Sequence, residues 1–81
     1  MIEHEYLKHL AAFAEYGTLS KAAEKLHISQ PSLTRSMKKL EEEFGVPLFF
    51  RTKNRLEFNE NGKLAADYAK RILEQTGVML E

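Results

Sequence analysis

The chain of 81 residues is long enough for one small domain, and its 43% hydrophobic and 30% charged content is that of a folded globular protein rather than a disordered one. It has no cysteine, which excludes a disulfide framework and a thiolate metal site and favours an intracellular protein. The net charge is zero, but residues 29–55 hold six Lys or Arg against three acids, while residues 1–28 and 56–81 are net acidic.

The first predicted element is a helix over residues 3–16, ended by Gly17. At 100° per residue one half of this helix is apolar, and the other half is polar. The apolar half holds Ile2, Tyr6, Leu7, Leu10, Ala11, Phe13 and Ala14, and the polar half holds His4, Glu5, Lys8, His9 and Glu15.

A shorter helix is predicted in "TLSKAAEKL", with Thr18 or Ser20 as its N-cap. Its adjacent alanines, Ala22 and Ala23, leave little bulk, so another helix can cross closely there. After the connection "HIS", Ser29 caps a third helix that has Pro31 in its first turn and ends at Gly45. Its buried stripe is Leu33, Met37, Leu40 and Phe44.

Two short apolar runs, residues 48–51 and 56–58, flank a polar tip at residues 52–54 and predict a β-hairpin. Asn59 is then the N-cap of a last helix that extends toward Leu80, about 31 Å long at 1.5 Å per residue. Two helices joined by a tight turn and followed by a hairpin form a winged helix-turn-helix. The expected fold class is therefore all-α with a small β wing, followed by a long C-terminal linker helix.

The exposed face of the third helix begins with an amide, hydroxyls and cations. Gln30 and Arg35 can bond to the edges of adenine and guanine, and Thr34 or Pro31 can touch a thymine methyl group. Lys38 and Lys39 suit phosphates, which position a protein without specifying sequence. Taken alone, this helix is slightly more typical of a capped, solvated helix end. The preceding helix, the tight turn and the basic hairpin favour DNA.

The hairpin adds Arg51, Lys53 and Arg55, which are either a solubilising tip or a wing that lies on the DNA backbone or enters the minor groove. Glu41 lies beside the buried stripe and is expected to pair with Arg51. An alternative of another class is a protein-interaction module in which Arg35 and Lys38 meet an acidic protein.

The last helix carries an apolar stripe that is longer than the domain needs. Its distal part, from residue 72 to residue 80, suggests a coiled-coil seam with a partner, and an extra core helix folded back on the domain has comparable weight. The predicted dimerisation residues are Leu64, Ala65, Tyr68, Ile72, Leu73, Thr76, Met79 and Leu80.

Nothing in the sequence indicates catalysis, a metal or a cofactor. The three histidines share no helical face at ligand spacing, the consecutive acids at residues 41–43 diverge around their helix, and no Gly-rich phosphate loop or nucleophile elbow is present. The N-terminus lacks the basic start and apolar run of a signal peptide, and no apolar run reaches transmembrane length, so no membrane partner is expected.

The stretch "AAFAEYGTLSKAAEKLHISQPSLTRSMKKLEEEFGVPLFFR" resembles the N-terminal DNA-binding domain of LysR-type transcriptional regulators. Four residues depart from the family pattern: Thr18 and Thr34 stand where serine is usual, Asn59 replaces a threonine, and Phe58 replaces an aliphatic residue. The shared positions are Phe13, Gly17, Ala22, Ala23, Leu26, Ser29, Gln30, Pro31, Leu40, Glu41, Gly45, Leu48, Phe49, Arg51 and Gly62.

The resemblance implies a bacterial, cytoplasmic, nucleoid-associated regulator that binds an inverted-repeat promoter site as a homodimer through its linker helix. Residues 1–58 would be the DNA-binding domain, with the helix-turn-helix at about 18–44 and the wing at about 48–58, and residues 59–81 the linker helix. A larger domain that binds a small-molecule effector and controls a tetramer is expected beyond Glu81. Base contacts are expected from Gln30, Pro31, Thr34 and Arg35, and backbone contacts from Thr18, Ser20, Ser29, Ser32, Lys38, Lys39, Arg51, Lys53 and Arg55.

Overall fold

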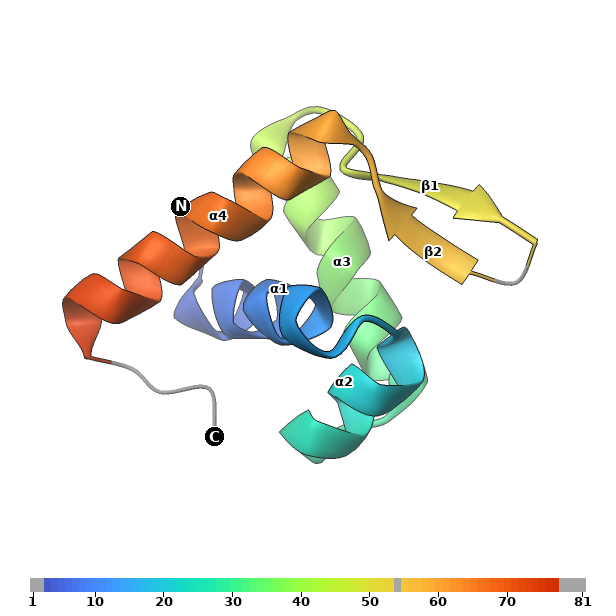
Figure 1. The fold of residues 1–81 in the computed structure, drawn as a ribbon, viewed down its shortest axis with the longest axis horizontal. Coiled ribbons are helices and arrows are strands. Elements are labelled where there is room, and N and C mark those ends of the chain that lie inside the picture. The colour runs from blue at the N-terminus through green and yellow to red at the C-terminus, as the bar shows by residue number, and fades with distance from the viewer. Residues whose placement is uncertain (1–2, 54, 78–81) are drawn as a thin grey trace.

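The structure, a computed structural model, describes residues 3–53 and 55–77. Within these ranges the elements follow the predicted order: α1 (His4–Tyr16), α2 (Leu19–Leu26), α3 (Gln30–Phe44), β1 (Phe49–Thr52), β2 (Arg55–Phe58) and α4 (Glu60–Thr76) (Figure 1). The hairpin projects from the helices as a wing. The predicted fold class, a winged helix-turn-helix with a long last helix, is confirmed.

Side-chain caps begin three of the helices. Thr18 Oγ1 accepts from the N–H of Lys21 at 3.1 Å, which selects Thr18 over Ser20 as the cap of α2. Ser29 caps α3 and Asn59 caps α4, as predicted, at 3.2 Å and 2.8 Å. Each cap satisfies a backbone N–H that the helix itself leaves without a partner, and this is worth about 1 kcal/mol.

The turn between α2 and α3 is short because His27 ends α2 in the left-handed conformation, with φ 60° and ψ 40°. Its N–H donates to the carbonyls of Ala23 and Glu24, and the next N–H, of Ile28, donates to Ala23 at 3.1 Å. The chain therefore turns in three residues, and α3 follows at a steep angle to α2 (Figure 1).

Helix α1 contacts α2, α3 and α4, and the core forms around it. The predicted stripe of α3 is confirmed, since Leu33, Met37 and Leu40 are fully buried and Phe44 packs against the same core. Within α1 the predicted faces need two corrections. Ala14, expected inside, is exposed, and His9, expected outside, is buried.

The buried imidazole of His9 has polar partners at both ring nitrogens. Its Nδ1 lies 2.7 Å from the hydroxyl of Ser36 on α3, and its Nε2 lies 3.4 Å from Glu5. Ser36 is small and buried, so α3 approaches α1 closely at this point and covers the imidazole. Buried polar groups are retained when they are hydrogen-bonded, and this pair satisfies that condition.

The hairpin is antiparallel with Phe49 opposite Phe58, and β1 lies one residue later than predicted at both ends. Leu48 is buried just before β1, and Thr52, predicted in the tip, belongs to β1 and pairs with Arg55. Phe49, Phe58 and Phe13 of α1 form a ring cluster with centroids 5.1–5.9 Å apart. This cluster fastens the base of the wing to the helices. Residue 54 of the predicted tip lies outside the described residues.

Glu41 has a different partner from the one predicted. Its Oε2 accepts from the N–H groups of Leu48 and Phe49 at 2.8 Å and 3.3 Å, and in the described part of the chain it makes no ion pair with Arg51. The chain leaving α3 presents these two backbone donors directly to the carboxylate. Glu41 therefore fixes the backbone at the start of the hairpin. Arg51 is exposed, so its guanidinium group is accessible to a ligand.

Helix α4 ends at Thr76 instead of extending toward Leu80, because Gly77 adopts the left-handed conformation with φ 75° and caps it. Ala65, Ala69 and Leu73 are buried in the protomer. The division into a domain at 1–58 and a linker at 59–81 stays a prediction. None of the helices in the described residues is long and apolar enough to cross a bilayer.

Candidate nucleic-acid interface

The first turns of α3 present the side chains that are predicted to contact bases. Gln30, Pro31 and Arg35 are exposed, and Thr34 is half-buried. The orientation of α3 is fixed by Leu33 and Met37, which lie on the face opposite these side chains and are buried in the core. The arrangement leaves a ridge of amide, hydroxyl and guanidinium groups facing outward on α3.

On one side of this ridge lies a hollow of about 340 Å³. It is lined by Thr18 and Ser20 of α2, by Gln30 of α3 and by Arg55 of the wing. Residues from three parts of the fold, far apart in the chain, therefore face the same space. A nucleic-acid strand lying along this hollow would meet hydroxyl, amide and guanidinium donors together.

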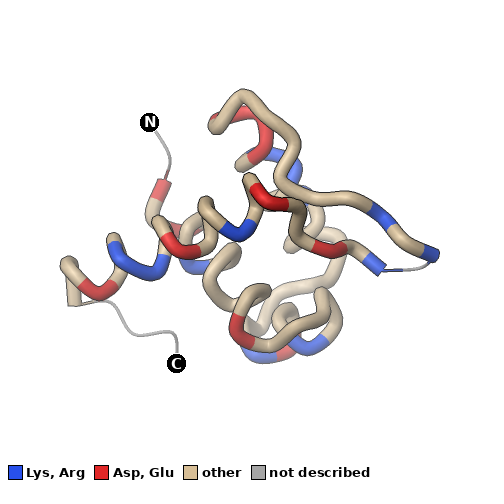
Figure 2. Tube along the Cα trace, turned by 45° about the horizontal axis from the view of Figure 1, so that its top comes forward, with Lys and Arg blue, Asp and Glu red and all other residues tan. Residues whose placement is uncertain are grey.

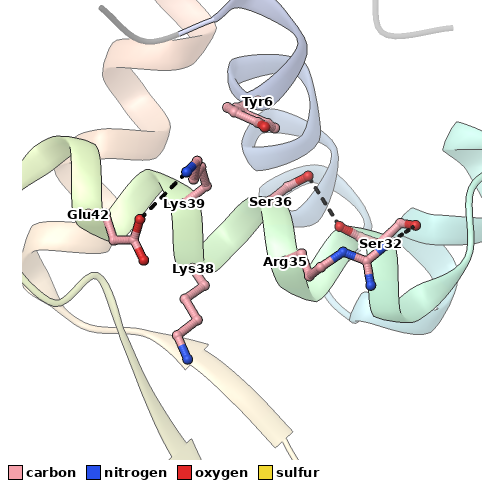
Figure 3. A pocket seen from close by; sticks show the side chains of 7 residues that line it. All are labelled: Tyr6, Ser32, Arg35, Ser36, Lys38, Lys39 and Glu42. Atoms are coloured by element: carbon pink, nitrogen blue, oxygen red, sulfur yellow. Dashed lines mark hydrogen bonds and ion pairs between the residues drawn. The ribbon is translucent and has the colours of Figure 1, made fainter.

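On the other side lies a second hollow, of about 370 Å³, shown in Figure 3. Arg35, Lys38 and Lys39 line it together with Ser32, and Tyr6 of α1 closes it. The sequence places Tyr6 in the apolar half of α1 and gives no signal for its surface position, which only the packing of α3 beside it reveals. The remaining lining residues are Ser36 and Glu42.

The hydroxyl groups of Ser29 and Thr18 differ in whether they still have a hydrogen to donate to a phosphate. Ser29 Oγ accepts from the N–H of Ser32 and donates its own hydrogen to the hydroxyl of Ser32 at 2.9 Å. It has no hydrogen left for a phosphate while this geometry holds, so its predicted backbone contact requires that bond to break. Thr18 Oγ1 acts as an acceptor in the cap of α2, which leaves its hydrogen available for a phosphate.

The wing carries the most outlying cations, as Figure 2 shows. Arg51, Lys53 and Arg55 are all exposed, and the acids of the chain lie mainly on the helices. Lys39 is 3.9 Å from Glu42, but both groups are more than half exposed, so this pair leaves the lysine available to a polyanion. The overall neutral charge thus hides a cationic wing beside a polar ridge.

His9 lies beneath the second hollow, and burial is the main cause that lowers its pKa, although Glu5 acts in the opposite direction and Lys8 adds to the lowering. The unfolded chain therefore takes up a proton at higher pH than the folded one, and the free energy of unfolding should fall as the pH drops below about 6.5. Urea unfolding at about pH 7.5 and about pH 5.5 checks this.

The matched variant is His9→Gln, which keeps a polar group beside Ser36 and cannot titrate. Its loss of stability between the two pH values should be smaller than that of the unsubstituted chain. Equal losses in both proteins would contradict a lowered pKa of His9 in the folded chain.

The predicted dimerisation residues on α4 differ in their exposure. Leu64 and Tyr68 are 70% and 49% exposed, and the Tyr68 ring packs edge-on against Phe44 with centroids 6.1 Å apart. Ala65 and Leu73 are buried in the protomer and Ile72 is half-buried, so the exposed apolar surface among the predicted dimerisation residues is that of Leu64 and Tyr68. Thr76 bonds His4 at 3.2 Å. Residues 79 and 80 lie outside the described residues.

Across the ranges 3–53 and 55–77, no three His, Cys, Asp or Glu side chains are grouped as metal ligands would be. The groups that do converge are hydrogen-bond donors and cations, which suit an acceptor-rich, anionic ligand.

Comparison with known proteins identifies the relatives of this chain. The sequence model of the family described as "Bacterial regulatory helix-turn-helix protein, lysR family" matches residues 4–63. The DNA-binding transcriptional dual regulator OxyR of Escherichia coli (strain K12) is 39% identical over 75 residues, and the regulator TcbR of Pseudomonas sp. (strain P51) is 41% identical over 76. These matches cover 93% and 94% of this chain, and 25% and 26% of those proteins.

Solved structures agree with these matches. The crystal structure of a CbnR_DBD–DNA complex superposes with a TM-score of 0.85 at 41% identity, covering 93% of this chain and 86% of that one. The BenM_DBD complex with benA site 1 DNA gives 0.84 at 33% identity, covering 93% and 84%.

Proposed function

The chain belongs to the lysR family of bacterial regulatory helix-turn-helix proteins, and we propose that it is the part of such a regulator that binds duplex DNA in a sequence-dependent manner. The observation that carries the proposal is the outward-facing ridge of Gln30, Pro31, Thr34 and Arg35, which lies between two donor-lined hollows with the cationic wing at one side. A family of transcription regulators also makes binding, rather than catalysis, the expected activity.

The ridge supports a major-groove position for α3. Arg35 can donate two hydrogen bonds to one guanine, and Gln30 can pair with an adenine edge. Lys38 and Lys39, about one turn further along α3, suit the flanking phosphates. The hollow between α2 and the wing supports a second phosphate strand near Thr18 and Arg55. The wing itself can follow the backbone or place an arginine in the minor groove.

A titration of duplex DNA at several salt concentrations tests this proposal. Five exposed cations, Lys38, Lys39, Arg51, Lys53 and Arg55, predict a slope of log K against log salt of about −4 to −5 for each protomer. A chain that bound no duplex at low salt, or bound with a flat salt dependence, would contradict DNA binding. It would favour instead an interaction module for an acidic protein.

The exposed part of α4 supports a homodimer. Leu64 and Tyr68 are one turn apart, so they form a short apolar stripe on the surface. We expect Tyr68→Glu to shift the chain from dimer to monomer in sedimentation equilibrium, because it places a charge in that stripe. Lys70→Glu, on another face of α4, is the matched control and should leave the mass unchanged. A dimer that persisted in Tyr68→Glu would exclude this seam.

The chain spans about a quarter of the length of the curated relatives that it matches (25% of OxyR). The properties of a whole regulator are therefore proposals here: a dimer on an inverted-repeat promoter site, a tetramer, a small-molecule effector bound by another domain, and action at the bacterial nucleoid in the cytoplasm.

A further inference from the structure

Ser32 stands at the centre of a chain of hydrogen bonds on the outward side of α3 (Figure 3). Its hydroxyl oxygen accepts from Nη2 of Arg35 at 3.1 Å and from the hydroxyl of Ser29 at 2.9 Å. These bonds connect the helix cap, one turn below, to the exposed guanidinium group.

The same turn is anchored from beneath. Ser36 donates to the carbonyl of Ser32 at 3.3 Å, and Ser36 is itself 2.7 Å from the buried imidazole of His9 on α1. The backbone at Ser32 is therefore connected to the core through the side chains of Ser36 and His9. This connection fixes the position of the Cα from which the Ser32 hydroxyl reaches Arg35.

The hydrogen count at Ser32 restricts what its hydroxyl can do. A serine oxygen has two lone pairs, and here both accept, one from Ser29 and one from Arg35. The only remaining capacity is its own hydrogen. Arg35 uses one of its five N–H groups on Ser32 and keeps four, enough for a bidentate contact with a guanine.

We propose that Ser32 is a positioning residue that determines specificity, because it holds the Arg35 side chain in the orientation in which it contacts a base. This inference rests on the proposed DNA binding. A free arginine side chain has many rotamers, and restraining it before binding lowers the entropy lost when a base contact forms. Ser32 thus acts on sequence preference through Arg35, in place of the simple backbone contact predicted from the sequence.

A double-mutant cycle tests the proposal. The four proteins are the unsubstituted chain, Ser32→Ala, Arg35→Ala and the double variant, each titrated with the preferred duplex and with one changed at the base pair that Arg35 discriminates. Ser32→Ala leaves the α3 cap intact, because Ser29 still accepts from the backbone N–H of residue 32. We expect this variant to lose about threefold or more of the preference between the two duplexes, and to lose none in the Arg35→Ala background.

Ser20→Ala is the comparison variant, since Ser20 lines the other hollow and should weaken both duplexes equally. The positioning role is overturned if Ser32→Ala also weakens both duplexes equally, or if its effect is the same with and without Arg35. An unsubstituted chain with no preference between any duplexes would overturn the proposed function and this inference together, a result that is distinct from loss of the Ser32 effect alone.

Discussion

Replacing Arg35 with alanine is expected to weaken binding to the preferred duplex by about 1–3 kcal/mol and to relax the preference at one base pair. Arg35 is the exposed guanidinium of the α3 ridge, and it is restrained by Ser32 at 3.1 Å. A bidentate arginine–guanine contact is lost when the base changes, so its energy appears as discrimination. Fluorescence titration of matched and substituted duplexes, at one fixed salt concentration, measures both effects.

Lys39→Ala is the matched control for this substitution, because Lys39 lines the same hollow but is expected to meet phosphate. It should weaken every duplex to a similar extent and reduce the salt slope by about 1. If Arg35→Ala behaved in the same way, with equal losses on preferred and scrambled duplexes, Arg35 would be a phosphate contact and the assignment of base contacts to the ridge would be wrong.

Replacing Gly62 with alanine is expected to destabilise the fold by about 3 kcal/mol, the upper end of the usual cost of overpacking. A Cβ at this position would overlap the carbonyl oxygen of Leu48 and lie 2.7 Å from a ring carbon of Phe58. The oxygen cannot withdraw easily, because it accepts from the N–H of Asn59 at 3.0 Å and Glu41 holds the N–H of Leu48 itself. Urea unfolding followed by circular dichroism measures the change.

A more stable Gly62→Ala protein would be expected if the space around residue 62 were open. Alanine favours a helix over glycine by about 1 kcal/mol, so an unobstructed Gly62 would give a more stable variant. Asn61→Ala, at the exposed neighbouring position, should change stability by less than about 0.5 kcal/mol and controls for general effects in the first turn of α4. A stabilised Gly62→Ala protein would contradict the close approach of the wing to α4.

Local signals in the sequence are sufficient for most of the fold. Capping side chains and glycine mark helix ends through bonds within a few residues, which is why the predictions for Ser29, Asn59 and Gly45 are confirmed. The spacing of Leu33, Met37 and Leu40 shows one buried face, because those three side chains project from the same side of a helix. The greater length predicted for α4 is wrong because Gly77 is a left-handed cap inside an otherwise periodic stretch.

Partners brought together by tertiary packing cannot be predicted in this way. His9 lies just outside the apolar half of its helix, and only the crossing of α3 at Ser36 explains its burial. The sequence pairs Glu41 with a nearby cation, whereas the structure supplies two backbone N–H groups that carry no sequence signal. The same holds for the candidate site: residue types and the outward face follow from the sequence, but the two hollows and the Ser32–Arg35 bond do not.

Selection of bound duplexes from a random pool tests the central claim most directly, because every possible site competes in one experiment. The chain, incubated with the pool at moderate salt, should enrich one sequence over successive rounds. For a dimer that sequence should be an inverted repeat with half-sites about one helical turn, roughly 34–36 Å, or a multiple of it apart. A pool that remained random in sequence after selection would contradict sequence-dependent DNA binding by this chain.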